Sequence, residues 1–159
     1  MSVFVTVGST SFDDLIKTVC SSEILQCLSD EGFKKVILQI GRGTVIPDKS
    51  DIIEVEWFRF KYSISQDIKN ASLIIGHAGA GTILDSLVEN KPLIAVLNDT
   101  LMNNHQIELA EELAKENYLA YCSCSDLLHT LKQPKSFKPF ISEPNMFPAF
   151  LEDFLGLSV

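Results

Sequence analysis

The sequence predicts an α/β domain built on an open, doubly wound parallel sheet. Short runs rich in β-branched residues recur along the chain, and segments with helical spacing separate most of them. The runs are almost continuously apolar, which is typical of parallel strands that helices cover on both faces. Alternating strands and helices of this kind fold with right-handed crossovers, so we expect a Rossmann-like sheet with helices on both sides.

Six segments have the composition of strands: Val3–Val7, Lys35–Ile40, Ile52–Glu56, Ser72–Ile75, Leu93–Leu97 and Tyr118–Cys122. Five have helical spacing: Phe12–Asp30, Ser65–Asn70, Thr82–Glu89, Gln106–Glu116 and Ser125–Leu131. Ser63–Gln66 and Asn103–Gln106 resemble capping boxes, in which paired polar side chains satisfy the first N–H groups of a helix. The stretch Thr44–Asp51 has no helical pattern and is expected to be a loop.

Size and charge narrow the class of protein. A chain of 159 residues with 46% apolar and 21% charged residues suits one globular domain with a proper core. The formal net charge of −8 argues against nonspecific binding to nucleic acid or to an anionic membrane, because both would repel an acidic surface. We therefore expect no nucleic-acid partner.

Cysteine and histidine usage points away from a metal site. The four cysteines contain no C-x-x-C pair, and the three histidines are scattered, so no zinc cluster is expected. Scattered thiols without a disulfide framework fit a reducing cytosol. The amino terminus lacks the features of a signal peptide, and no apolar run approaches the length of a membrane span.

The pattern divides the chain into a ligand-binding domain, 1–132, and a carboxy-terminal region, 133–159. Four prolines within Gln133–Pro148 predict a loop or extended segment. Pro148–Leu157 has the spacing of an amphipathic helix, with Phe150 and Phe154 on its apolar side. This helix either packs on its own sheet or docks a partner.

Two glycine-bearing loops fall at one predicted crevice. Ligands of doubly wound sheets bind beyond the carboxyl ends of the strands where the strand order reverses, commonly between the first and fourth strands. The first strand is followed by Gly8, Ser9 and Thr10, and the fourth by the run Gly76–Thr82. Both loops should therefore meet at this switch point.

The second of these loops suits a diphosphate. Glycines let the backbone approach an anion closely, and a helix that starts near Thr82 directs unpaired N–H groups at it, with His77 as a further donor. The alternative is a tight strand-to-helix turn with a threonine cap and a packed histidine. The spacing is neither G-x-G-x-x-G nor a Walker A loop, which weakens the case for a nicotinamide dinucleotide site.

Asp85 follows one helical turn beyond Gly81. It belongs to a polar stripe with Thr82, Ser86 and Glu89, while the intervening apolar residues are expected to face the core. A carboxylate one turn above a phosphate-binding helix start suits the two hydroxyls of a ribose. The alternative is a solvated aspartate that the helix dipole favours.

Four motifs in order carry a resemblance to a known family: Val5–Leu15, Leu38–Thr44, Gly76–Thr82 and Leu101–Gln106. Over residues 2–122 the chain closely resembles the catalytic subunits of the eukaryotic two-subunit UDP-GlcNAc transferase, which adds the second GlcNAc to dolichyl-diphosphate-GlcNAc. More distantly, it is similar to the carboxy-terminal half of the bacterial UDP-GlcNAc transferase that makes lipid II, a GT-B enzyme.

The resemblance implies a role for each motif in binding UDP-GlcNAc. His77 and the backbone of Gly79, Ala80, Gly81 and Thr82 would hold the diphosphate, and Asp85 stands where relatives usually have a ribose-binding glutamate. Three further groups complete the implied site: the phosphate-facing Gly8, Ser9 and Thr10, the uracil-holding Trp57 and Phe58 just past the third strand, and the sugar-binding Asn104, His105 and Gln106. Arg42 either meets phosphate or is solvated.

The resemblance also implies a mechanism and a partner. One inverting displacement would transfer GlcNAc, with His77 and the helix start stabilising the departing diphosphate and with no metal or other cofactor. The chain offers no convincing general base, so we expect it from a membrane-anchored, acceptor-binding subunit that forms a heterodimer and recruits this chain to the cytosolic face of the endoplasmic reticulum. The alternative is a non-catalytic UDP-sugar-binding regulatory module.

Overall fold

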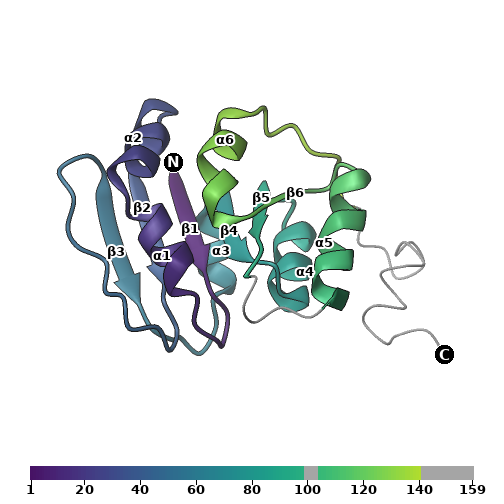
Figure 1. The fold of residues 1–159 in the computed structure, drawn as a ribbon, viewed down its shortest axis with the longest axis horizontal. Coiled ribbons are helices and arrows are strands. Elements are labelled where there is room, and N and C mark those ends of the chain that lie inside the picture. The colour runs from purple at the N-terminus through teal and green to yellow at the C-terminus, as the bar shows by residue number, and fades with distance from the viewer. Residues whose placement is uncertain (99–103, 141–159) are drawn as a thin grey trace.

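The computed structural model describes residues 1–98 and 104–140. Six parallel strands form one sheet in the order β3-β2-β1-β4-β5-β6 (Figure 1). Their bounds are β1 Ser2–Thr6, β2 Lys35–Gln39, β3 Glu54–Phe58, β4 Leu73–His77, β5 Leu93–Val96 and β6 Ala120–Cys122. The predicted fold class is confirmed, and the strand order reverses between β1 and β4 as expected.

Helices cover both faces of the sheet. Their bounds are α1 Asp13–Val19, α2 Ser22–Asp30, α3 Ser65–Asn70, α4 Ala80–Val88, α5 Asn104–Lys115 and α6 Leu127–Lys132, the last preceded by a 3₁₀ turn at Cys124–Asp126. One core cluster joins Val3 and Val5 of β1 to α1, α2 and α6, and the other joins Phe4 to α3, α4 and α5. Alternate residues of β1 thus face opposite helical layers, as a doubly covered sheet requires.

The single helix predicted over Phe12–Asp30 is wrong, because the chain forms α1 and α2 with a break between them. Ser21 is extended (φ −65°, ψ 148°), and its hydroxyl accepts a hydrogen bond from the Ile24 N–H at 3.4 Å. A serine that caps a new helix start competes with continuation of the old helix, and the apolar spacing of the two halves conceals that competition.

The capping box predicted at Ser63–Gln66 is also wrong. Ile64 is the N-cap of α3 and provides no side-chain cap, while the Ser63 hydroxyl accepts from the Ser65 N–H at 3.2 Å. The Gln66 side chain instead donates forward to Asn70 at 2.9 Å. The second predicted box, Asn103–Gln106, stays a prediction, because Asn103 and the side chains of residues 104–106 lie outside the described part of the chain.

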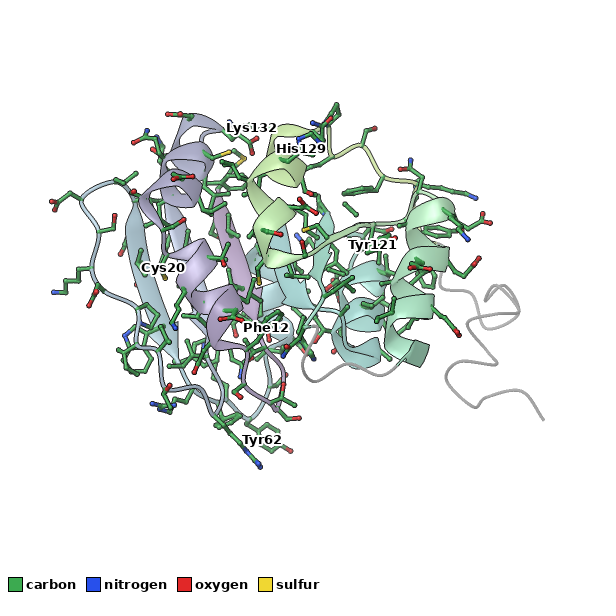
Figure 2. The ribbon with its side chains drawn as sticks, viewed as in Figure 1. Phe12, Cys20, Tyr62, Tyr121, His129 and Lys132 are labelled. Atoms are coloured by element: carbon green, nitrogen blue, oxygen red, sulfur yellow. The ribbon has the colours of Figure 1, made fainter. Side chains whose placement is uncertain are left out.

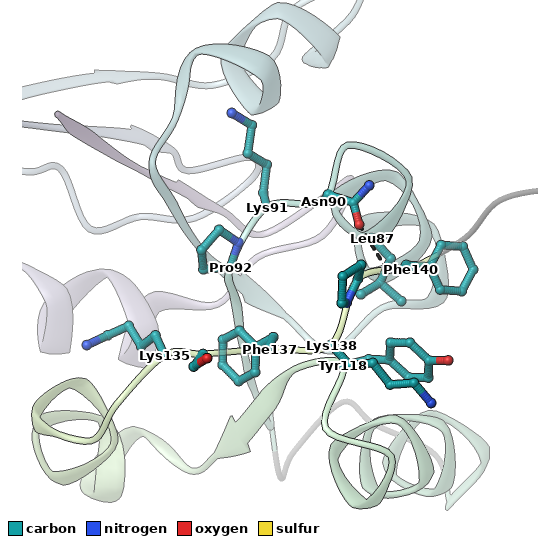
Figure 3. A pocket seen from close by; sticks show the side chains of 11 residues that line it. Leu87, Asn90, Lys91, Pro92, Tyr118, Lys135, Phe137, Lys138 and Phe140 are labelled. Atoms are coloured by element: carbon teal, nitrogen blue, oxygen red, sulfur yellow. Dashed lines mark hydrogen bonds between the residues drawn. The ribbon is translucent and has the colours of Figure 1, made fainter.

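The segment 133–140 forms no helix or strand, as its prolines predict, and it lies against Leu87 of α4 and the turns that follow α4 and α5. The Lys138 N–H donates to the Asn117 carbonyl at 2.8 Å, and the Phe140 N–H donates to the Asn90 side chain at 2.9 Å. A cavity of about 290 Å³ lies beneath this segment (Figure 3). The predicted helix at Pro148–Leu157, with Phe150 and Phe154, lies outside the described residues.

The loop expected at Thr44–Asp51 contains no helix or strand. Among the described residues, no helix has the length and apolarity needed to cross a bilayer.

Candidate ligand site at the sheet switch point

The two glycine-bearing loops meet at the carboxyl ends of β1 and β4, which are neighbours in the sheet. Gly8 has φ +67°, a conformation that glycine adopts without strain. A Cβ added at Gly8 would lie 2.6 Å from Cε1 of His77, and one added at Gly79 would overlap Nε2 of the same ring. The imidazole of His77 therefore lies between two glycines, one from each loop.

His77 is a largely buried titratable group at this junction. Burial lowers the pKa of His77, and the nearby backbone of Thr6 opposes that shift only in part. Nδ1 is buried and has no hydrogen-bond partner among the described residues. A buried imidazole with an unused nitrogen is a good candidate for ligand contact, because buried polar atoms in proteins are normally satisfied.

The lowered pKa predicts how stability depends on pH. Between the folded pKa of His77 and its ordinary value near 6.5, the unfolded chain binds more protons than the folded chain. The contribution of His77 to stability is therefore fully present above about pH 6.5 and is lost as the pH falls, by at most about 1.4 kcal/mol per pH unit. Urea unfolding at pH 7.5 and 5.5 should show a smaller loss for His77→Gln than for the natural protein; equal losses would contradict the assignment.

The amino terminus of α4 opens into the same region. Gly79 is the N-cap in an extended conformation (φ −81°, ψ 142°), and no side chain caps it among the described residues. The first N–H groups of this nine-residue helix are therefore available, and the helix dipole adds partial positive charge there. A Cβ at Gly81 would have no neighbour within 4 Å in the described part of the chain, so among these residues this backbone borders open space.

The polar stripe predicted along α4 is only partly correct. Thr82 and Ser86 are buried, at 7% and 0% exposure, whereas Val88 is 43% exposed. The Ser86 hydroxyl donates to the Thr82 carbonyl at 2.8 Å, which satisfies it within the helix. A Cβ at Gly76 would lie 2.9 Å from Cγ2 of Thr82, so a glycine in β4 lets α4 pack closely on the sheet.

A hollow of about 350 Å³ lies beside these loops. It is lined by Gly8, Ser9, Gln39, Phe60, Lys61, Tyr62, Ser63, Ile64, Ser65 and Asp85. Partial burial raises the pKa of Asp85. The structure thus brings Gly8, Ser9 and Asp85 to one concave surface, from loops and a helix that are far apart in the sequence.

The predicted position of Trp57 and Phe58 just past the third strand is wrong, because both lie inside β3. Trp57 pairs with Leu38 and is 42% exposed. Phe58 stacks on Phe4, with ring centroids 6.3 Å apart, and the Lys61 ammonium lies 4.3 Å above its ring. Neither residue lines the hollow.

The aromatic residues that do line the hollow are Phe60 and Tyr62, which the sequence reasoning missed. Phe60 is 54% exposed and Tyr62 is fully exposed, projecting from the end of the molecule where the strands finish (Figure 2). Two large exposed aromatics in one short loop mark a candidate contact surface. That signal was available, but the misplaced end of the third strand concealed it.

Gln39, at the end of β2, was also missed. It is 3% exposed, and its side chain makes hydrogen bonds to Thr6, Val7, Gly8 and Arg59. A lone amide in the otherwise apolar strand Lys35–Gln39 is the sequence signal, since a buried amide needs partners for both ends.

The remaining predicted residues lie near this edge but without side-chain evidence of a contact. Arg42 is exposed, and its backbone N–H donates to the Thr10 carbonyl at 3.2 Å, which joins two loops. The first turn of α5 consists of Asn104, His105 and Gln106, whose side chains lie outside the part of the chain that the structure describes. Their roles stay predictions.

Comparison with known proteins identifies the domain. Residues 2–146 match the family described as the glycosyltransferase family 28 C-terminal domain. The chain belongs to this family. It is 47% identical over 144 residues to the human UDP-N-acetylglucosamine transferase subunit ALG13, covering 89% of this chain but 12% of the human protein. The subunit of the same name from Yarrowia lipolytica is 35% identical over 148 residues, covering 90% of this chain and 76% of that protein.

Solved structures agree with the family 28 assignment. The NMR solution structure of ALG13 superposes with a TM-score of 0.70 at 30% identity, covering 89% of this chain and 90% of that one. The crystal structure of Acinetobacter baumannii MurG gives a TM-score of 0.62 at 19% identity, covering 83% of this chain and 39% of that one, which concerns the fold alone. The resemblance found in the four sequence motifs is thereby confirmed. The domain corresponds to the carboxy-terminal half of a GT-B glycosyltransferase.

Proposed function

We propose that this chain binds UDP-GlcNAc at the switch point and is the catalytic subunit that transfers the second GlcNAc to GlcNAc-diphosphodolichol. The observation that carries the proposal is the convergence of His77, two glycine loops, the uncapped start of α4 and Asp85 on one edge of the sheet. The names of the relatives, UDP-N-acetylglucosamine transferase subunits, support the choice of donor.

The start of α4 and His77 would hold the diphosphate. Backbone N–H groups from Ala80 to Thr82 face an anion with the helix dipole behind them, and Gly81 leaves room for its oxygens. Burial keeps the free His77 imidazole neutral, so it offers one N–H donor, and the bound diphosphate would favour its protonated form. Both groups oppose charge that grows on the leaving diphosphate, which is where electrostatic catalysis acts.

The rest of the donor extends into the hollow. Asp85 lines the hollow, and we propose that it accepts hydrogen bonds from the ribose hydroxyls. We assign the base to the loop of Phe60 and Tyr62 rather than to Trp57 and Phe58. An exposed aromatic offers a stacking face to a nucleobase at little conformational cost. Asn104, His105 and Gln106, at the start of α5, remain the candidates for the hydroxyls of the transferred sugar.

The reaction we propose is a single displacement at the anomeric carbon. The acceptor hydroxyl oxygen forms the new bond as the bond from that carbon to the diphosphate breaks, so the configuration inverts and UDP leaves. The hydroxyl proton goes to a base on the partner. No metal is required in this scheme, and transfer should survive a chelator.

The partner that this scheme requires is a membrane-anchored subunit that binds the acceptor. Residues 2–146 match one half of a GT-B enzyme, and the name of the relatives, transferase subunit, supports a partner that supplies the acceptor-binding half. We propose that this subunit forms a heterodimer with the chain and recruits it to the cytosolic face of the endoplasmic reticulum.

The decisive experiment is UDP-GlcNAc-dependent transfer to a GlcNAc-diphosphate-lipid. The chain is mixed with membranes that contain the partner but lack its native counterpart. Activity that His77→Ala abolishes is the expected result. UDP binding without transfer in the presence of the partner would overturn the catalytic assignment and favour a UDP-sugar-binding regulatory module.

Gly81→Ala should weaken UDP binding without lowering the free energy of unfolding. Its Cβ meets no atom of the described residues within 4 Å, so we expect unfolding stability to be unchanged or raised by up to about 1 kcal/mol, since alanine is the better helix former. If the open space receives the diphosphate, the added methyl should weaken UDP binding about tenfold or more in calorimetry, a loss of about 1.4 kcal/mol. Normal UDP affinity would place the diphosphate elsewhere.

A further inference from the structure

Gln39 joins two loops, those that follow β1 and β3, through one buried amide. Its Oε1 accepts from the Thr6 hydroxyl at 2.5 Å and from the Val7 N–H at 3.3 Å. Its Nε2 donates to the carbonyl of Gly8 at 2.8 Å and to the carbonyl of Arg59 at 2.8 Å. All four hydrogen-bonding positions of the amide are therefore used.

The two bonds from Nε2 reach opposite sides of the candidate site. Gly8 belongs to the loop that touches His77, whereas Arg59 begins the loop that continues into Phe60, Lys61 and Tyr62. The first loop lies on the diphosphate side of the hollow and the second on its aromatic side. No ladder hydrogen bond joins the two loops directly, because β1 and β3 are separated by β2.

Arg59 extends the same linkage. Its guanidinium donates to the carbonyls of Gly41 and Gly43 at 3.1 and 2.8 Å, and its carbonyl accepts from the Gly41 N–H as well as from Gln39. The loop that contains Phe60 is thus held at its root on both sides. The buried amide of Gln39 at the centre of this network favours one geometry, because displacing either loop leaves a buried polar group unpaired.

We propose that Gln39 is a positioning residue that sets the spacing between the diphosphate-binding loop at Gly8 and the base-binding loop at Phe60 and Tyr62. This inference rests on the proposed function, because it assigns those two loops to the two ends of one nucleoside diphosphate. Gln39 lines the hollow, but protein partners occupy all four hydrogen-bonding positions of its amide. It acts by holding both contact surfaces at the separation that the intact ligand spans.

This role makes a distinctive prediction for ligand fragments. When two ends of a ligand bind surfaces held at the right separation, the second contact forms as an intramolecular event and the affinities reinforce each other. If the spacing between the loops is loosened, the intact ligand loses this gain in affinity, but each end can still bind its own loop. Loss of Gln39 should therefore weaken UDP much more than uridine or pyrophosphate.

The test compares three probes, UDP, uridine and pyrophosphate, on the full chain by calorimetry or by competition against a fluorescent UDP analogue. Gln39→Met keeps the volume but removes both donors, and Gln39→Glu keeps the acceptors for Thr6 and Val7 while turning oxygen toward two carbonyls. We expect UDP affinity to fall at least about tenfold in both variants, and uridine and pyrophosphate affinities to change less than about threefold.

Leu28→Ala is the matched control for general destabilisation. Leu28 is fully buried in α2 and does not line the hollow, so truncating it weakens the core without touching the network. Temperature-dependent unfolding of each variant confirms that the folded protein is assayed. We expect Leu28→Ala to leave all three affinities unchanged at a temperature where it is folded.

Equal losses for UDP and both fragments in the Gln39 variants, or no loss for any of them, would overturn the positioning role. Failure of the unmodified chain to bind UDP would instead overturn the proposed function, on which the inference rests. The two failures are distinguishable because the second shows in the natural protein before any substitution is made.

Discussion

Gly41→Ala is expected to lower the free energy of unfolding by about 2–5 kcal/mol, a large part of the stability of a typical domain. Gly41 has φ +59°, which an alanine adopts only at a cost, and its added Cβ would overlap the backbone carbonyl oxygen of Thr10. A backbone atom cannot rotate away as a side chain does. Relief therefore requires the loop at Gly41 to separate from the loop at Thr10.

Urea unfolding is the measurement, with Gly32→Ala as the control. Gly32 also has positive φ, +98°, but its nearest neighbour is the mobile end of the Met1 side chain at 3.3 Å. The control should lose only the backbone cost, about 1–2 kcal/mol. Similar losses in the two variants would show that the close approach at Gly41 is easily relieved.

The same substitution has a consequence for binding. The loop at Gly41 contacts Thr10 and receives both bonds from the Arg59 guanidinium, so moving it disturbs both sides of the hollow. Residual folded Gly41→Ala protein should therefore bind UDP more weakly than Gly32→Ala protein at equal folded fraction. Gly41 affects the site through loop positions, without needing to touch the ligand.

The sheet was predictable because its strands carry strong, mutually consistent signals. Near-continuous apolar runs alternate with helices, and the right-handed crossover rule leaves few topologies for such a pattern. The position of the candidate site was predictable for the same reason. The two glycine loops follow β1 and β4, the two strands between which the strand order reverses. Gly8 and Ser9 line the hollow, and His77 lies between Gly8 and Gly79.

The errors arose where local pattern and tertiary pairing disagree. β3 is an edge strand, and its apolar run begins at Ile52, yet its register is set by pairing Lys35 with Glu54 and Gln39 with Phe58. The strand consequently ends two residues later than the composition suggests, which moves the loop that we propose for the base from Trp57 to Phe60. Pairing with β2 is a long-range property that a single apolar run does not contain.

The Gln39 network could be suspected but not traced from sequence. A buried amide after the apolar run Val36–Leu38 indicates that hydrogen-bond partners exist, but its four partners come from the ends of two other strands, β1 and β3. Only the sheet order brings those ends together. The same reason explains why Asp13, which looks like a helix-start acid, in fact accepts hydrogen bonds from the backbone and hydroxyl of Thr44.

Gly79→Ala tests the packing of His77 without a backbone penalty. Gly79 has φ −81°, which suits alanine, so any loss of stability comes from overlap of the new Cβ with the imidazole. We expect a loss of about 1–3 kcal/mol in urea unfolding. In a His77→Ala background the ring is gone, and the added cost of Gly79→Ala should fall below about 0.5 kcal/mol.

The double variant also separates packing from ligand binding. Removal of the ring relieves the overlap, so Gly79→Ala no longer lowers the free energy of unfolding in the double variant. It does not replace the imidazole N–H donor that the diphosphate has lost. We therefore expect the double variant to bind UDP as weakly as His77→Ala alone, although its stability matches that single variant. Recovered UDP affinity in the double variant would mean that His77 serves only to fill space between the glycine loops. Unrelieved destabilisation would mean that Gly79 is constrained by something other than the ring.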